Sequence, residues 1–184
     1  MSETAELAAL AEALLAAAGE PVPFEALHAA AGEGVERGAL ETALAFLQAR
    51  HNQPGSGLVV EQVAGGWRLA TRPEHESALR VFLGLRAKAR LSQAALETLA
   101  IVAYRQPITL PEINFLRSVS SAGVVRTLLE RTLVRVAGRK EVVGTPLLYR
   151  TTKQFLVSFG LESLAALPTI EEVAREVGEP ADGT

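Results

Sequence analysis

The stretch LETLAIVAYRQPIT, residues 96–109, carries the strongest structural signal in this chain. Its apolar side chains recur three, four and seven positions apart, which predicts a helix whose apolar face is formed by Leu96, Leu99, Ala100 and Ala103. Pro107 ends that helix, because proline lacks the backbone donor that a further helical turn needs. Thr109 followed by Glu112 is a capping-box pattern, which predicts that a second helix begins at this point.

The residues that follow predict a third helix and then a two-stranded hairpin. The third helix is expected over about 122–131, the two strands over 133–137 and 147–151, and a closing helix over 153–159. Three helices followed by a hairpin is the element order of a winged helix. We therefore expect residues 91–168 to form a winged-helix domain.

The first half of the chain repeats this order about 86 positions earlier. Leu27 follows Pro21 by six positions, just as Ile113 follows Pro107. An apolar helix face is expected before Pro21, at Leu7, Leu10, Leu14 and Leu15. The later elements are expected as helices over 24–31 and 37–49, strands over 58–64 and 67–71 joined by a turn at Gly65-Gly66, and a closing helix over 73–83. The sequence thus predicts a mostly α fold with small β-hairpins, built from two tandem winged-helix domains.

Local signals place the boundaries of these domains. Ser120 or Ser121 is expected to cap the third helix of the second copy, and Thr152 its closing helix. We expect an N-terminal domain over 1–86 and a C-terminal domain over 91–168, joined by a short polar connection. Residues 169–184 are expected to form a flexible acidic tail.

Composition limits the classes of protein to which the chain can belong. Hydrophobic residues make up 48% of its 184 residues, enough to bury a core in each of two small domains. The absence of cysteine excludes a disulfide framework and thiolate metal sites. The apolar stretch 7–18 lacks a preceding basic flank and is shorter than the ~20 residues of a membrane span. We expect a cytoplasmic protein that does not engage the membrane.

The net charge of −3 is unevenly distributed along the chain. Residues 1–90 carry 8 basic and 11 acidic side chains, residues 91–168 carry 9 and 5, and residues 169–184 carry 1 and 5. The basic middle is consistent with an anionic partner, with neutralisation by the tail, or with an ordinary solvated surface.

The sequence shows no pattern that is typical of a catalytic, metal or cofactor site. It contains no phosphate-binding Gly-rich loop with Lys-Ser/Thr and no Gly-x-Ser-x-Gly elbow. The three histidines lack metal-ligand spacing, and the paired carboxylates Glu171 and Glu172 lie in the tail, where nothing would orient them as acid and base. We expect neither an enzyme nor a cofactor.

A winged helix often binds nucleic acid through its third helix, so a DNA-binding transcriptional regulator is the alternative hypothesis. Arg117, Arg126 and Arg131 could make weak contacts with DNA phosphates. The predicted third helix offers no Asn or Gln to read bases, however, and the arginines could instead pair with glutamates. A third hypothesis is protein recognition, since the alanine-rich first helix would allow close packing in a dimer.

The second half resembles the bacterial segregation and condensation protein B family. In the first half only the architecture and the segment Trp67–Thr71 are similar to it. The resemblance is carried by residues 96–104, 106–109, 126–131, 138–142, 144–146, 149, 151–152, 155–156 and 159–161.

This resemblance implies a non-enzymatic accessory subunit of the bacterial SMC–kleisin complex, which acts in chromosome condensation and partition during cell division. It implies a homodimer formed largely through the first domain, which binds the kleisin ScpA and reaches the SMC ATPase through it. Association with the nucleoid and indirect or weak contact with DNA would follow. The kleisin would bind along the exposed side of the second domain's first helices and its wing, where the candidate residues are Tyr104, Arg105, Arg139, Lys140 and Tyr149. Tyr149 alternates with Leu148 along a strand, so either of the two could be the core residue.

Overall fold

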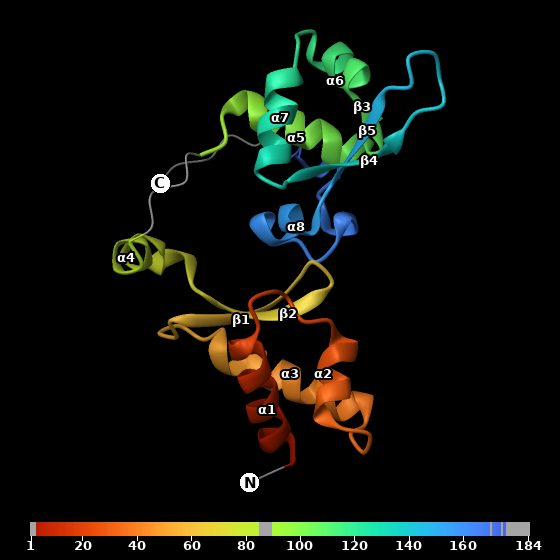
Figure 1. The fold of residues 1–184 in the computed structure, drawn as a ribbon. Helices are drawn as coiled ribbons and strands as arrows, with labels where there is room; N and C mark the ends of the chain where they lie inside the picture. Colours follow the sequence, from red (N-terminus) through yellow and green to blue (C-terminus); the bar gives the residue numbers. More distant parts are fainter. Residues whose placement is uncertain (1–2, 85–89, 170, 174, 176–184) are drawn as a thin grey trace.

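The structure is a computed structural model that describes residues 3–84, 90–169, 171–173 and 175, and it contains two similar halves (Figure 1). The first half comprises α1 (Glu3–Ala17), α2 (Phe24–Ala31), α3 (Arg37–His51), β1 (Leu58–Val63), β2 (Gly66–Thr71), the 3-10 helix η1 (Pro73–His75) and α4 (Glu76–Phe82). The second comprises α5 (Gln93–Arg105), β3 (Ile108–Thr109), α6 (Leu110–Arg117), α7 (Ala122–Glu130), β4 (Val134–Arg139), β5 (Leu147–Thr151), α8 (Lys153–Phe159) and the 3-10 helix η2 (Leu164–Ala166).

The two halves share one topology. In the second half, β3 follows the first helix and pairs antiparallel with β5, giving the strand order β3-β5-β4. In the first half, Val22 follows α1 and forms an antiparallel bridge with Trp67 of β2. Each half therefore runs helix, extended segment, helix, helix and hairpin, which is the order of a winged helix. The predicted fold class, mostly helical with small hairpins, is confirmed.

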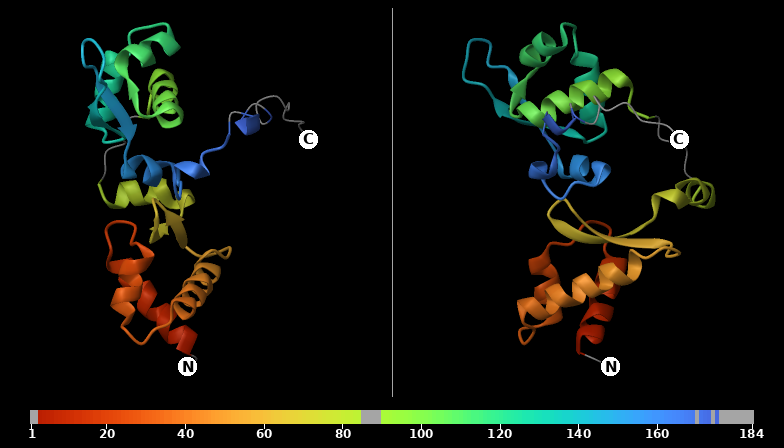
Figure 2. Two further views of the ribbon diagram at one scale, coloured as in Figure 1. Left: turned by 90° about the vertical axis from the view of Figure 1, so that its right-hand side faces the viewer. Right: turned by 180° about the vertical axis from the view of Figure 1, so that it is seen from behind.

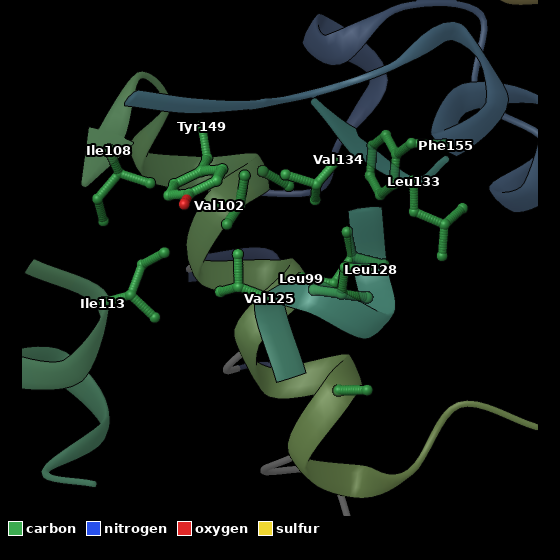
Figure 3. Close-up of a cluster of buried hydrophobic side chains, with 12 residues drawn as sticks. Leu99, Val102, Ile108, Ile113, Val125, Leu128, Leu133, Val134, Tyr149 and Phe155 are labelled. Carbon is green, nitrogen blue, oxygen red and sulfur yellow. The ribbon is translucent and has the colours of Figure 1, made fainter. Parts of the chain in front are cut away.

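The core of the second half is built from side chains of its helices α5 to α8 and of its three strands (Figure 3). On α5 the buried row is Ala95, Leu99 and Val102, whereas Leu96 is 40% exposed and Ala100 is exposed as well. The predicted helix is correct, but Leu96 and Ala100 were wrongly assigned to its buried face. Apolar residues fill more than one face of α5, and periodicity alone does not say which face is covered.

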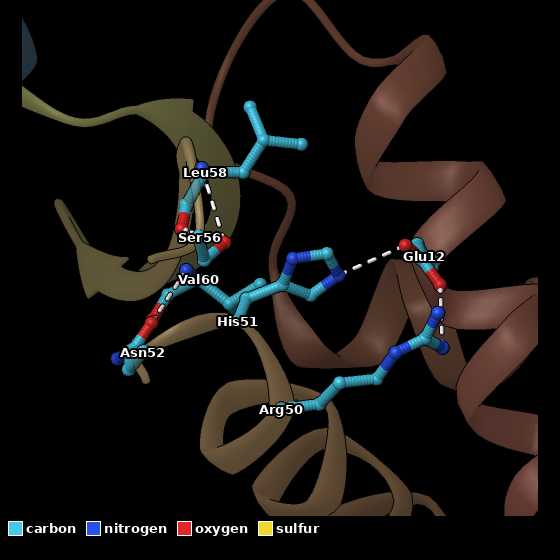
Figure 4. A network of polar contacts seen from close by, with 7 residues as sticks. All are labelled: Glu12, Arg50, His51, Asn52, Ser56, Leu58 and Val60. Atoms are coloured by element: carbon cyan, nitrogen blue, oxygen red, sulfur yellow. Dashed lines mark hydrogen bonds and ion pairs between the residues drawn. The ribbon is translucent and has the colours of Figure 1, made fainter. Parts of the chain in front are cut away.

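The core of the first half lies between α1 and α3. Leu7 and Leu15 are buried there as predicted, while Leu10 is 39% exposed. A polar network joins the same two helices at the edge of this core (Figure 4). Glu12 pairs with Nε2 of His51 at 2.8 Å and with Arg50 at 3.3 Å. These contacts tie the middle of α1 to the end of α3.

The predicted caps are partly confirmed. Thr109 and Glu112 form the capping box at the start of α6, and the hydroxyl of Thr152 accepts a hydrogen bond from the backbone N–H of Phe155. Ser121 stands at the N-cap position of α7, but its side chain does not cap the helix. Its buried hydroxyl instead accepts a hydrogen bond from Arg117. Sequence spacing located this helix start correctly but predicted the wrong partner for the serine.

The turn of the first hairpin lies one residue earlier than predicted. Ala64 and Gly65 form it, with φ of 52° and 73°, and Gly66 is already paired with Val63 in the ladder. A Cβ on Gly66 would lie 2.8 Å from the backbone carbonyl carbon and oxygen of Val22. Gly66 is therefore required by the close approach of the Val22 bridge rather than by the turn.

The tip of this hairpin meets the second half, as the two views in Figure 2 show. The backbone N–H groups of Ala64 and Gly65 donate to the carbonyl oxygens of Leu161 and Glu162, each at 2.8 Å. Most of the predicted connection over 84–90 and most of the predicted acidic tail lie outside the described residues. Within the described part of the chain, no helix is long and apolar enough to cross a membrane.

Candidate protein-interaction surfaces

A groove of about 490 Å³ lies on the second half, between the end of α5 and the outer face of α6. Phe115 and Leu116 are its most prominent apolar side chains, with exposed fractions of 84% and 48%. Because α6 begins directly after β3, its outer face lies beside the last turn of α5. The groove is lined by Arg105, Pro107, Ile108, Pro111, Glu112, Phe115 and Leu116. We call these residues the α6 groove.

Glu112 carries a fixed negative charge at the edge of the α6 groove. One carboxylate oxygen accepts hydrogen bonds from the backbone N–H and the hydroxyl of Thr109, and the other accepts one from Nζ of Lys140 at 2.5 Å. The Lys140 ammonium, followed by the two Thr109 donors, lowers the pKa of Glu112 from 4.5 to about 2. The same carboxylate therefore caps α6 and attaches the wing loop between β4 and β5 to it.

This arrangement predicts a difference in acid sensitivity. Folding lowers the pKa of Glu112, so its contribution to stability is fully present above pH 4.5 and is lost as the pH falls to about 2. When the pH falls from 4.5 to about 2, the free energy of unfolding of the Glu112→Gln variant is expected to decrease less than that of the wild type. Urea denaturation at both ends of the range measures the difference. Glu141→Gln, on the exposed wing, is the control and is expected to follow the wild type; equal acid losses in all three proteins would contradict the assignment.

The structure distributes the candidate kleisin-contacting residues over several places. Arg105 is exposed and lines the α6 groove, and Lys140 reaches the groove through Glu112. Arg139 donates a hydrogen bond to the carbonyl oxygen of Thr145 within the wing. The hydroxyl of Tyr104 donates to the carbonyl oxygen of Pro168 at 2.6 Å and so attaches the segment after α8 to α5. Only Arg105 and Lys140 of the predicted set are brought together.

Tyr149 is a correction to the sequence prediction, because it lies in the core rather than on an exposed surface. Tyr149 is 7% exposed, and Figure 3 shows its ring among Ile108, Val102 and other core side chains. β5 is the central strand of its sheet, and Tyr149 is paired with Ile108 on one side and Val136 on the other. The alternative that the sequence left open, Tyr149 in the core instead of Leu148, is the one observed.

Arg117 and Arg126, which were considered for DNA contact, pair with glutamates. Arg117 is only 11% exposed and pairs with Glu97 at 3.0 Å, which joins α6 to α5. Arg126 is 81% exposed and pairs with Glu130 one turn later. Arg131 is half-buried at the end of α7. These arrangements do not favour the DNA-binding alternative.

A second apolar surface lies at the end of α4, which Figure 1 and the right-hand view of Figure 2 place away from the other helices. Val81 and Phe82 are each 84% exposed and Leu83 is 58% exposed. None of the three belongs to either core cluster of the described residues. We call Val81, Phe82 and Leu83 the α4 surface. Isolated exposed apolar side chains are ordinary, but a contiguous group marks an interaction surface.

The sequence analysis did not single out Phe115, Leu116 or the α4 surface. Val81-Phe82-Leu83 ends a predicted closing helix, where three adjacent apolar residues resemble core. Phe115 lies two positions after the buried Ile113, so helical spacing could have placed it on the opposite face. Leu116 lies three positions after Ile113, close to the buried face, and spacing alone does not identify it as exposed.

The fold and its exposed apolar surfaces define a protein suited to binding other proteins. The chain belongs to the family described as segregation and condensation complex subunit ScpB, whose model matches residues 9–170. A segregation and condensation protein B from Syntrophotalea carbinolica is 48% identical over 170 residues, covering 92% of this chain and 85% of that protein. The resemblance seen in the second half of the sequence therefore extends through most of the first.

Two solved structures are also similar to this chain in sequence. ScpB from Mycobacterium tuberculosis is 33% identical, with 88% of this chain and 99% of that chain covered and a TM-score of 0.41. A dimer of the ScpB N-terminal domain complexed with a ScpA peptide is 25% identical, with 49% of this chain and 99% of that chain covered and a TM-score of 0.40.

Proposed function

We propose that this chain is a non-enzymatic accessory subunit of the bacterial SMC–kleisin complex, acting in chromosome condensation and partition. The observation that carries the proposal is the match of residues 9–170 to the family of segregation and condensation complex subunits. The proposed partners are a second copy of the chain and the kleisin ScpA, which would connect the subunit to the SMC ATPase. The proposed location is the cytoplasm, at the nucleoid.

The two apolar surfaces support a division of labour between the halves. The α4 surface exposes three adjacent apolar side chains in the first half and is the proposed contact between two copies. The α6 groove combines exposed apolar side chains with Arg105 and Glu112, a composition suited to a partner segment with an apolar face flanked by charges. The first half would thus dimerise, and the second half would take part in binding the kleisin.

Isothermal titration of the intact chain with purified ScpA from the same bacterium tests the proposal. Binding with a dissociation constant in the low micromolar range or tighter is expected. The α6 groove offers exposed apolar side chains that a partner can bury, and it carries both a positive and a negative side chain that can pair with charges on the partner. An absence of heat at this concentration, with both proteins folded, would contradict the proposed role.

The DNA-binding alternative is tested with the same protein in a gel-shift panel of unrelated duplexes. A regulator would retard one duplex tightly, with an affinity that falls steeply with salt. The proposed subunit is expected to retard all duplexes equally and only at high protein concentration.

A further inference from the structure

The segment Phe159-Gly160-Leu161 is among the residues that resemble the family, and it lies away from both apolar surfaces. Gly160 ends α8 in the left-handed conformation, with φ of 65°. The backbone N–H of Leu161 then donates to the carbonyl oxygen of Leu156 at 2.9 Å, closing the helix end as in a Schellman motif. Leu156 and Leu161 both pack on the core of the second half. The position of Leu161 is therefore fixed by its own half.

The two backbone carbonyl groups that follow the end of α8 accept hydrogen bonds from the first half. Leu161 accepts from the N–H of Ala64 and Glu162 from that of Gly65, each at 2.8 Å. In a two-residue hairpin turn these two N–H groups have no partner within the hairpin and ordinarily face water. Here both are satisfied by the segment after α8.

Burial at the hairpin tip supports the same contact. Val63 is fully buried and Ala64 is 7% exposed, yet neither belongs to a core cluster of the described residues. The rest of the junction is more open, since a cavity of about 440 Å³ lies between residues 18–21 and 68–71 of the first half and residues of α8. The turn is therefore a closely packed point of contact between the two halves, with hydrogen bonds that cross the junction.

We infer that docking of the Ala64-Gly65 turn onto the carbonyl groups of Leu161 and Glu162 fixes the orientation of the two winged-helix halves. The turn acts as a clamp because its two adjacent N–H donors bond to two consecutive carbonyl acceptors. A single hydrogen bond would let the halves rotate about it, whereas two adjacent bonds resist that rotation. The α6 groove is thereby held in one orientation relative to the core of the first half. This inference concerns the isolated chain and does not depend on ScpA.

Hydrogen exchange of the unmodified protein, followed by NMR, tests the clamp directly. The N–H groups of Ala64 and Gly65 are expected to exchange at least about 100-fold more slowly than unprotected amides, because both are bonded within the junction. The N–H of Gly144 is the control and is expected to exchange rapidly, since it lies in the wing turn and no described carbonyl accepts from it. Exchange of Ala64 and Gly65 as fast as that of Gly144 would overturn the inference.

A wedge variant provides a second test. Ala64→Arg places a long side chain in the junction, and Gln62→Arg places the same side chain on the exposed part of β1 as its control. The chain contains no cysteine, so spin labels on Glu41→Cys of α3 and Arg126→Cys of α7 report one distance between the halves. Dilution with unlabelled chain removes distances between copies. A narrow distribution in the wild type and in Gln62→Arg, broadened in Ala64→Arg, is expected; an equally narrow distribution in Ala64→Arg would overturn the inference.

Discussion

The Phe115→Glu variant is expected to bind ScpA at least about 30-fold more weakly than the wild-type chain. Phe115 is 84% exposed in the free protein, so a bound segment would bury most of its ring, a contribution of about 2 kcal/mol. The introduced carboxylate would also lie in the same groove as Glu112, where it would repel an acidic partner and would lose its hydration against an apolar one. Isothermal titration with purified ScpA measures the change.

Phe46→Glu is the matched control for this variant. Phe46 is an exposed phenylalanine of the first half, on α3, with an exposed fraction of 49%. Phe46 lies outside the α6 groove, so its replacement is expected to weaken ScpA binding much less than Phe115→Glu does. Neither residue belongs to a core cluster, so both variants are expected to unfold at the wild-type urea concentration. Wild-type affinity in Phe115→Glu would show that the α6 groove does not bind the kleisin.

The second large effect is expected at the α4 surface, where Phe82→Glu should convert the dimer to a monomer. In a two-fold dimer each substitution occurs twice at one interface, so two buried rings are lost and two charges are introduced. A loss of about 2 kcal/mol per ring corresponds to a weakening of self-association by more than about 100-fold. Multi-angle light scattering across a dilution series measures the mass of the wild type and of the variant.

Val143→Glu is the control for the effect of adding a charge to an exposed apolar position. Val143 is fully exposed at the wing and belongs to the second half. Its replacement is expected to leave the dimer intact. A dimeric Phe82→Glu variant would place the self-association surface elsewhere on the chain and would remove the proposed role of α4.

Secondary structure was largely predictable from the sequence because its local signals agree with one another. The capping box of Thr109 and Glu112 is set by residues three positions apart, and it appears in the structure as predicted. The repeat of Pro21 and Leu27 at Pro107 and Ile113 correctly indicated two copies of one topology.

The errors arose where a residue has two local solutions and tertiary contacts select one. Ser121 could cap α7 by its position, but Arg117 supplies a competing donor to its hydroxyl from the preceding helix. Gly65 and Gly66 could both serve a turn, but the turn uses Ala64 and Gly65 because Gly66 must accommodate the backbone of Val22. Contacts of this kind join segments far apart in sequence, and local spacing does not specify them.

The site was less predictable than the fold for the same reason. Arg105 and Lys140 were identified as surface residues, and the structure places Arg105 in the α6 groove and pairs Lys140 with Glu112 at its edge. Tyr149 was assigned to the surface although it is buried, since strand alternation leaves two equivalent choices of face. The sequence does not show that the residues of the α4 surface are exposed, because an apolar helix end has the same composition whether it is exposed or buried.

Light scattering of the intact chain mixed with purified ScpA tests the central claim most directly, because it reports self-association and kleisin binding together. The proposed function predicts a single species whose mass accounts for ScpA together with two copies of this chain. Separate elution of ScpA and of a monomeric chain, with both proteins folded, would contradict it.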